Sequence, residues 1–114
     1  LEGGTPEALT RGGAAGEPTV LRDASTVVFS RSTLNSPAEL FSVPVTGGTA
    51  TPLTQLNAPV LARVAMNLPE SVTVRGAGGT PVQMWILRPP GFDPARKWPL
   101  VFWVHGGPQG AFLD

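Results

Sequence analysis

The stretch Trp98-Pro-Leu-Val-Phe-Trp-Val-His-Gly-Gly-Pro-Gln-Gly-Ala-Phe112 joins an apolar run to a glycine-rich turn. Five consecutive apolar residues, Leu100 to Val104, lie between a proline and the sequence His105-Gly106-Gly107-Pro108. A short apolar run bounded in this way predicts a strand that is buried on both faces, in the interior of a sheet covered by helices. We therefore expect this stretch to lie at the centre of a fold.

The glycine-rich turn after this run carries the chemical prediction. A His-Gly-Gly sequence directly after a strand is typical of loops that stabilise a negatively charged oxygen. In such loops a backbone N–H points at the oxygen on which charge develops when a carbonyl group is attacked. Glycine allows the main chain to approach a substrate closely and to adopt dihedral angles that other residues avoid. The sequence therefore predicts that the chemistry of the protein begins at this turn.

Composition limits the classes of function. Eight basic and eight acidic residues cancel without any block of like charge, so neither a nucleic-acid surface nor an anionic-membrane surface is predicted. The chain has no cysteine, and no cluster of His, Asp or Glu has metal-ligand spacing, so we expect no metal and no cofactor. No apolar run approaches the roughly 20 residues of a membrane-spanning helix. The compartment, whether cytoplasmic or exported, and the oligomeric state stay open.

A repeat in the first half predicts one blade of a β-propeller. Gly3-Gly-Thr-Pro-Glu-Ala-Leu-Thr10 returns 44 residues later as Gly47-Gly-Thr-Ala-Thr-Pro-Leu-Thr54. A period of about 40–45 residues is typical of a four-stranded blade. Two coincidental Gly-Gly-Thr hairpins in an unrelated all-β domain are the alternative. The strand candidates between turn signals are Thr19–Arg22, Thr26–Ser32, Glu39–Val45 and Thr49–Thr54.

The pattern changes after the repeat. Within residues 57–69, the segment Val60–Met66 fits either a short helix or an extended crossing. A second β region follows, with strands predicted at Ser71–Arg75 and Thr80–Arg88 around a glycine-rich hairpin turn. No amphipathic helix of useful length follows Glu70, so the chain lacks the layers that would cover a doubly apolar strand. We therefore expect Phe102, Trp103 or their neighbours to be exposed.

These features occur together in an order that resembles a known family. The motifs concerned are Ser36-Pro-Ala-Glu-Leu40, Leu53-Thr54, Pro69-Glu70, Gly79-Thr80, Trp85, Pro89-Pro90-Gly91-Phe92, Trp98-Pro99-Leu100-Val101 and His105-Gly-Gly-Pro-Gln-Gly110. Over nearly the whole chain they resemble the prolyl oligopeptidase family of serine peptidases, in its acylaminoacyl-peptidase and dipeptidyl-peptidase branch. The resemblance implies the last blade of a β-propeller at 1–56 and a connector at 57–69. It implies the N-terminal strands of an α/β-hydrolase domain at 70–114, in a fragment of a two-domain protein.

The resemblance also implies an activity and a set of loop residues. It implies hydrolysis of short peptides through an acyl-enzyme, by an aminopeptidase-like, acylaminoacyl or dipeptidyl enzyme. By position, the backbone N–H of Gly107 is the oxyanion-hole donor, and Gly106 is the neighbouring candidate. Pro108 has no N–H to donate and is expected to stiffen the loop. The prolyl-oligopeptidase branch proper has an aromatic residue where this chain has His105, which favours the aminopeptidase-like branches.

The remaining machinery of a serine hydrolase is not found in these residues. No Gly-x-Ser-x-Gly elbow occurs, so the nucleophile, acid and base are expected beyond Asp114, and this piece alone is expected to be inactive. His105, the one histidine, is expected to shape the loop by hydrogen bonding rather than to act as the base. Asp93 is expected to form a turn rather than to act as an acid. The tryptophans are expected to be packing residues.

Two alternatives to a peptidase remain open. A carboxylesterase or lipase uses the same His-Gly-Gly loop, although the repeat argues against it because those enzymes carry no propeller in front. A propeller-based binding protein with a non-catalytic hydrolase domain is the second alternative. It would require an elbow without serine.

Overall fold

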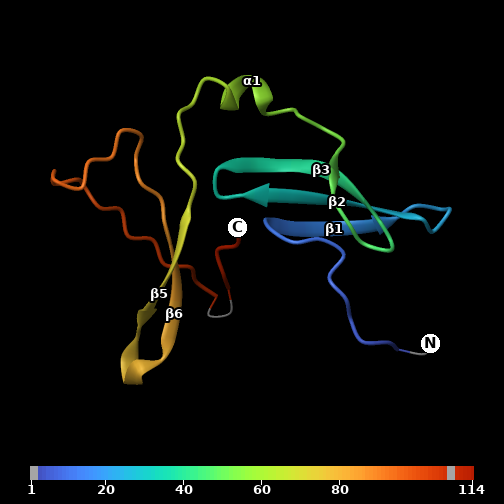
Figure 1. The fold of residues 1–114 in the computed structure, drawn as a ribbon, viewed down its shortest axis with the longest axis horizontal. Coiled ribbons are helices and arrows are strands. Elements are labelled where there is room, and N and C mark those ends of the chain that lie inside the picture. Colours follow the sequence, from blue (N-terminus) through green and yellow to red (C-terminus); the bar gives the residue numbers. More distant parts are fainter. Residues whose placement is uncertain (1–2, 108–109) are drawn as a thin grey trace.

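The computed structural model describes residues 3–107 and 110–114, which form two antiparallel sheets. The first sheet has the strand order β1-β2-β3-β4, and the second consists of β5 and β6. Figure 1 shows the hairpin β5–β6 apart from the larger sheet, with α1 on the segment that joins them. The elements are β1 (Ala14–Val20), β2 (Thr26–Thr33), β3 (Ser36–Pro44), β4 (Thr51–Pro52), α1 (Ala58–Leu61), β5 (Glu70–Arg75), the 3₁₀ turn η1 (Ala77–Gly79) and β6 (Pro81–Ile86).

The core of the larger sheet lies on one face of β2 and β3. Val27, Phe29 and Val43 are its buried side chains. They share a face because side chains alternate along a strand and because Val27 pairs with Val43. Leu9, Phe41 and Ala50 pack against this cluster. Along β3, Phe41 and Val43 face this cluster, whereas Leu40 is exposed.

The strands of this sheet follow the predicted order with shifted ends. β2 and β3 lie where the sequence places them, whereas β1 begins earlier than expected and β4 is only two residues long. The register of β1 against β2 shifts between Gly16 and Thr19, and Glu17 has a φ of +50°, which together describe a bulge. The two copies of the eight-residue repeat are in contact, because the N–H of Gly48 donates to the carbonyl of Leu9 at 3.3 Å. Assignment of this meander to a propeller blade stays a prediction.

The first residue of the connector, Asn57, is hydrogen-bonded to a carboxylate on β3. Glu39 accepts hydrogen bonds from the backbone N–H of Asn57 at 2.9 Å, from the Asn57 side-chain amide at 3.0 Å and from the hydroxyl of Thr54. The Thr54 hydroxyl first, and then the Asn57 N–H, lower the pKa of Glu39 to about 2. Pro59 lies in the first turn of α1, where its missing N–H has no consequence. A short helix, one of the two forms expected for Val60–Met66, occurs two residues earlier than predicted and includes only residues 60 and 61 of that segment.

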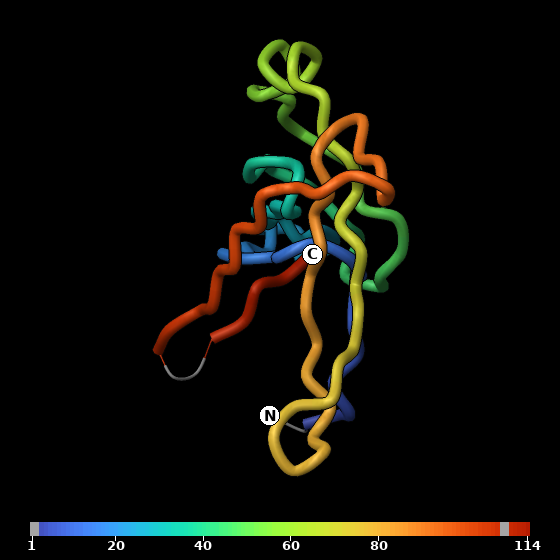
Figure 2. The backbone as a smooth tube through the Cα atoms, turned by 90° about the vertical axis from the view of Figure 1, so that its left-hand side faces the viewer, coloured from blue at the N-terminus to red at the C-terminus, as the bar shows by residue number. Residues whose placement is uncertain are grey.

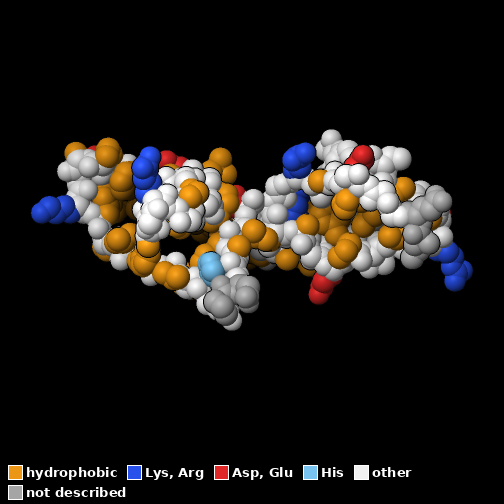
Figure 3. Space-filling model, turned by 90° about the horizontal axis from the view of Figure 1, so that it is seen from below, with side chains coloured by type: hydrophobic (Ala, Val, Ile, Leu, Met, Phe, Trp, Pro, Cys, Tyr) orange, Lys and Arg blue, Asp and Glu red, His pale blue; other side chains and the backbone are white. Residues whose placement is uncertain are grey.

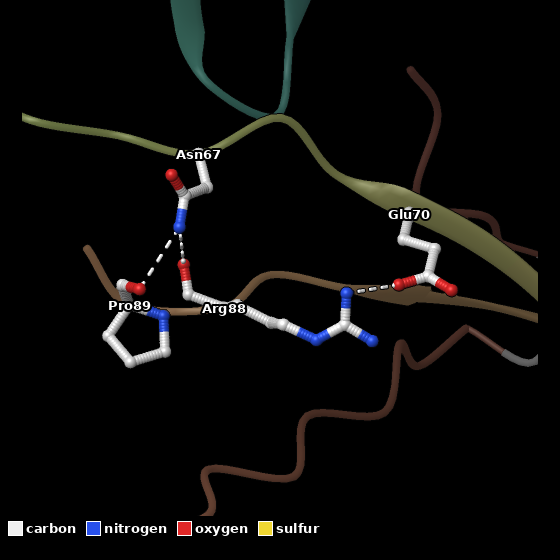
Figure 4. A network of polar contacts seen from close by, with 4 residues as sticks. All are labelled: Asn67, Glu70, Arg88 and Pro89. Atoms are coloured by element: carbon white, nitrogen blue, oxygen red, sulfur yellow. Dashed lines mark hydrogen bonds and ion pairs between the residues drawn. The ribbon is translucent and has the colours of Figure 1, made fainter. Parts of the chain in front are cut away.

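A second set of polar contacts lies at the end of the connector (Figure 4). The side-chain amide of Asn67 donates to the carbonyls of Arg88 at 3.2 Å and Pro89 at 3.0 Å. Arg88 forms an ion pair with Glu70 at 2.5 Å. These contacts join the start of β5 to the chain that leaves β6, and the predicted hairpin is confirmed by pairing from Glu70–Ile86 to Arg75–Pro81.

The apolar run Leu100–Val104 differs from expectation. It forms no strand in the described structure, and its side chains are between 66% and 89% exposed. A strand needs hydrogen-bonding neighbours, and a doubly apolar strand also needs covering layers, neither of which the described segments supply. The prediction of a buried strand is therefore wrong for this structure, whereas the expected exposure of Phe102 and Trp103 is confirmed. Figure 2 shows the segment extending away from the β5–β6 hairpin.

Candidate functional site

The candidate loop, His105-Gly106-Gly107, follows the exposed apolar run. Gly107 has a φ of +136°, a conformation that L side chains rarely adopt and that glycine adopts readily. All three residues are exposed. Among the described residues, the backbone N–H groups of Gly106 and Gly107 donate no hydrogen bond to a backbone carbonyl. The loop therefore presents these main-chain N–H groups to the surface, and their role as oxyanion-hole donors stays a prediction.

His105 lies between the loop and an aromatic ring. Its Nδ1 atom is 3.4 Å from the carbonyl oxygen of Gly106, and its ring meets that of Phe112 edge-on at 5.9 Å. Within the described residues no carboxylate hydrogen-bonds to His105, so no acid–base pair is built on this histidine here. Figure 3 shows the histidine, in pale blue, with apolar side chains beside it on the same face.

The residues after the loop return towards it. Phe112 packs against Trp103 with ring centroids 5.3 Å apart, and its carbonyl accepts the indole N–H of Trp85 at 2.8 Å. Asp114 accepts the N–H of Leu34 at 2.6 Å, in the turn between β2 and β3. Sequence reasoning assigned no role to Phe112 or Asp114. The available signal was an aromatic residue close behind the glycines, which gives no indication of its partner.

Two predictions about neighbouring residues have different outcomes. Pro108 lies outside the described residues, so its expected stiffening role stays a prediction. Asp93 is confirmed as a turn residue, because its Oδ1 accepts the N–H of Ala95 at 2.9 Å. Its carbonyl accepts the indole N–H of Trp98 at 2.8 Å, and Trp98 packs on Phe92 with centroids 5.7 Å apart. These contacts fit the packing role expected for Trp98.

Two hollows of the described surface lie away from this loop. An apolar hollow of about 150 Å³ lies beside the core of the larger sheet, between Leu9, Pro18 and Phe29. A second, of about 200 Å³, lies between Glu39, Phe41 and Leu61. Neither is lined by a residue of the candidate loop. The candidate site is thus an exposed loop and not a cavity.

Two other kinds of feature are absent from the described residues. Within 3–107 and 110–114, no three His, Cys, Asp or Glu side chains lie close enough together to hold a metal ion. In that part of the chain, no helix combines the length and the apolar character that crossing a membrane requires.

Comparison with known proteins gives relatives with one recurring name. The chain is 31% identical over 85 residues, or 75% of its length, to a protein named dipeptidyl-peptidase 5 from Porphyromonas endodontalis. It is 34% identical over 111 residues to a probable dipeptidyl-peptidase 5 from Trichophyton verrucosum, and 35% identical over 115 residues to one from Emericella nidulans. Each of the last two alignments covers 96% of the chain.

The similarity covers only a small part of each relative. The chain spans between 12% and 15% of the length of these three proteins. No family model matches the chain. No solved structure matches it. Similarity over most of the chain to proteins named as dipeptidyl-peptidases supports a peptidase family for it.

Proposed function

We propose that this chain is one segment of a serine peptidase that removes dipeptides from short peptides through an acyl-enzyme. The observation that carries the proposal is the similarity, over 96% of the chain, to proteins named as probable dipeptidyl-peptidases. Short peptides are the proposed substrates. The name of these relatives also selects the dipeptidyl activity among the three that the sequence resemblance implies.

In the proposed organisation the two sheets belong to different domains of the whole protein. Residues 1–56 form the last blade of a propeller, 57–69 the connector and 70–114 the first strands of the hydrolase domain. The four-stranded meander, the short helix α1 and the β5–β6 hairpin are consistent with this division. In the proposed whole protein, strands and helices contributed by other segments cover the run Leu100–Val104, which is exposed here.

The proposed role of the candidate loop is electrostatic. When a serine hydroxyl attacks the substrate carbonyl, negative charge develops on the carbonyl oxygen. The N–H of Gly107, with that of Gly106 as the neighbouring candidate, donates a hydrogen bond to this oxygen and stabilises the transition state. The φ of Gly107 supports this role, because it requires a residue without a side chain at the point where the substrate approaches.

The test is made on the whole protein with dipeptidyl and aminoacyl chromogenic amides and with a simple ester. Release of the chromophore from dipeptidyl amides, together with labelling by a serine-directed fluorophosphonate, is expected. Cleavage of the ester alone would instead support the carboxylesterase alternative. Binding of peptides without any turnover or labelling would support the non-catalytic binding protein.

Gly107→Ala tests the donor within the active protein. Alanine retains the N–H but disfavours a φ of +136°, so the donor moves and kcat is expected to fall by about 100-fold. Gly91→Ala is the matched control, because Gly91 also has a positive φ, +69°, and an added Cβ there meets nothing within 4 Å. Equal kcat values for the two variants would contradict the role of Gly107.

A further inference from the structure

The chain on either side of the glycines of the candidate loop forms two arms, residues 103–105 before them and residues 110–114 after them. Phe112, on the second or returning arm, contacts the first. Its ring contacts Trp103 before the loop, at 5.3 Å between centroids, and His105 at the start of the loop, at 5.9 Å. The two rings approach it at different angles, 59° for Trp103 and 71° for His105. Tilted and edge-on geometries are those in which aromatic pairs attract one another. One side chain therefore contacts both ends of the segment that leads into the glycines.

The backbone of Phe112 is fixed from a different element. The indole N–H of Trp85, on β6, donates to the carbonyl of Phe112 at 2.8 Å. Trp85 is partly buried and pairs with Ser71 of β5, so the donor projects from a hydrogen-bonded hairpin rather than from a loop. A second contact follows two residues later, where Asp114 accepts the N–H of Leu34 at 2.6 Å. Residues 110–114 are thus anchored both to the β5–β6 hairpin and to the turn between β2 and β3.

The two arms also touch directly at a second glycine. A Cβ added to Gly110 would lie 2.8 Å from the carbonyl oxygen of Gly106 and 3.0 Å from Nδ1 of His105. Both distances are shorter than ordinary contacts, and the nearer atom belongs to the backbone. The returning arm therefore packs against the candidate loop itself, with no space for a side chain between them.

From these contacts we propose that Phe112 and Trp85 are positioning residues for the oxyanion loop. Phe112 holds His105 and Trp103 at one end of the loop, and Trp85 holds Phe112 in place from β6. Neither residue donates to the oxyanion. They restrict the directions in which the N–H groups of Gly106 and Gly107 point. The inference rests on the proposed function for its catalytic consequence, but the restriction of the loop is a separate physical property that is measurable in this chain.

The first experiment measures backbone ¹⁵N order parameters of Gly106 and Gly107 in the 114-residue chain. Values near those of rigid backbone, about 0.85, are expected in the original chain. Phe112→Leu removes the aromatic contacts, and Trp85→Phe removes only the indole donor, so both are expected to lower the order parameters towards about 0.6. Phe112→Tyr keeps the ring and is expected to retain the original values.

Phe92→Leu is the matched control. Phe92 forms a comparable aromatic pair with Trp98, at 5.7 Å, and among the described residues it forms no aromatic pair with residues 103–114. Loss of order in this variant equal to that in Phe112→Leu would overturn the inference, because the effect would then be a general loss of packing. Unchanged order parameters in both Phe112→Leu and Trp85→Phe would also overturn it, as would a loop that is already mobile in the original chain. Trp85→Phe keeps the test valid if Phe112→Leu does not fold.

The second experiment measures kinetics in the whole peptidase. A positioning role predicts that Phe112→Leu lowers kcat by about tenfold with KM nearly unchanged, because only the transition state uses the oriented N–H. Phe112→Tyr is expected to restore kcat. A rise in KM at constant kcat would contradict the role, since it indicates lost substrate binding. If the whole protein hydrolyses no peptide, the proposed function fails, whereas the order parameters still decide whether Phe112 restrains the loop.

Discussion

Glu39 gives this protein a defined response to acid. Its pKa is lowered from an ordinary value of 4.5 to about 2, mainly by the hydroxyl of Thr54 and then by the N–H of Asn57. A carboxyl group with a lower pKa in the folded state stabilises that state above pH 4.5, and this contribution is lost as the pH falls towards 2. Unfolding midpoints in urea between pH 5 and 2 are therefore expected to fall less steeply in Glu39→Gln than in the original chain. Glu7→Gln, at an exposed position, is the control, and an equal slope in Glu39→Gln and the original chain would refute the assignment.

Ala24 has a conformation that suits glycine better. It lies in the turn between β1 and β2 with a φ of +56°, where an L residue other than glycine is strained by about 1–2 kcal/mol. Ala24→Gly relieves this strain at an entropic cost of about 0.5–1 kcal/mol, so a net gain of about 0.5 kcal/mol is expected. The control Ala38→Gly, at an exposed position on β3, should lose about 0.5–1 kcal/mol. Urea unfolding followed by circular dichroism measures both, and a loss in Ala24→Gly would contradict the prediction.

The elements of the larger sheet depend on a very small core. Val43 is 2% exposed and pairs with Val27, so Val43→Ala is expected to lower the free energy of unfolding by about 2 kcal/mol. Val20→Ala, on the outer strand β1, removes a side chain that is 57% exposed and is expected to cost less than about 0.5 kcal/mol. Chemical denaturation of the two variants side by side checks the difference. Equal losses would mean that the buried cluster is not the main source of stability of this sheet.

The elements that could be predicted from the sequence are those whose pattern is set by neighbouring residues. Strand alternation and turn residues are properties of neighbouring positions, which is why β2, β3 and the hairpin β5–β6 were predictable. The prediction of a buried strand at Leu100–Val104 was wrong because burial requires partner strands and helices, and apolar composition alone does not supply them. The positive φ of Gly107 agrees with the expectation that glycine is needed in the candidate loop, whereas its role as a donor stays a prediction. Phe112 and Trp85 were not predictable as a pair, because their contact joins positions 27 residues apart without any periodicity.

The molecule as a whole exposes a continuous apolar segment, and self-association is the expected consequence. Leu100–Val104 is an extended run without a partner in the described structure, and such runs pair with other chains. Val101→Asp, at a side chain that is 89% exposed, is expected to shift the chain towards monomer in sedimentation experiments. Leu56→Asp is the control, because it adds the same charge at a side chain that is 80% exposed but lies outside the apolar run. A similar shift in both variants would mean that net charge, rather than the apolar run, governs association.

The three tryptophans occupy positions 85, 98 and 103, and the chain has no tyrosine. Intrinsic fluorescence therefore reports on residues 70–114, while the four-stranded sheet emits almost nothing. Within that half, Trp85 and Trp98 donate their indole N–H groups to carbonyls and are partly buried, whereas Trp103 is 78% exposed and should emit at longer wavelength. Emission during unfolding thus follows one sheet and the far-ultraviolet signal follows both. The separation between the two curves gives the degree to which the halves unfold as one cooperative unit.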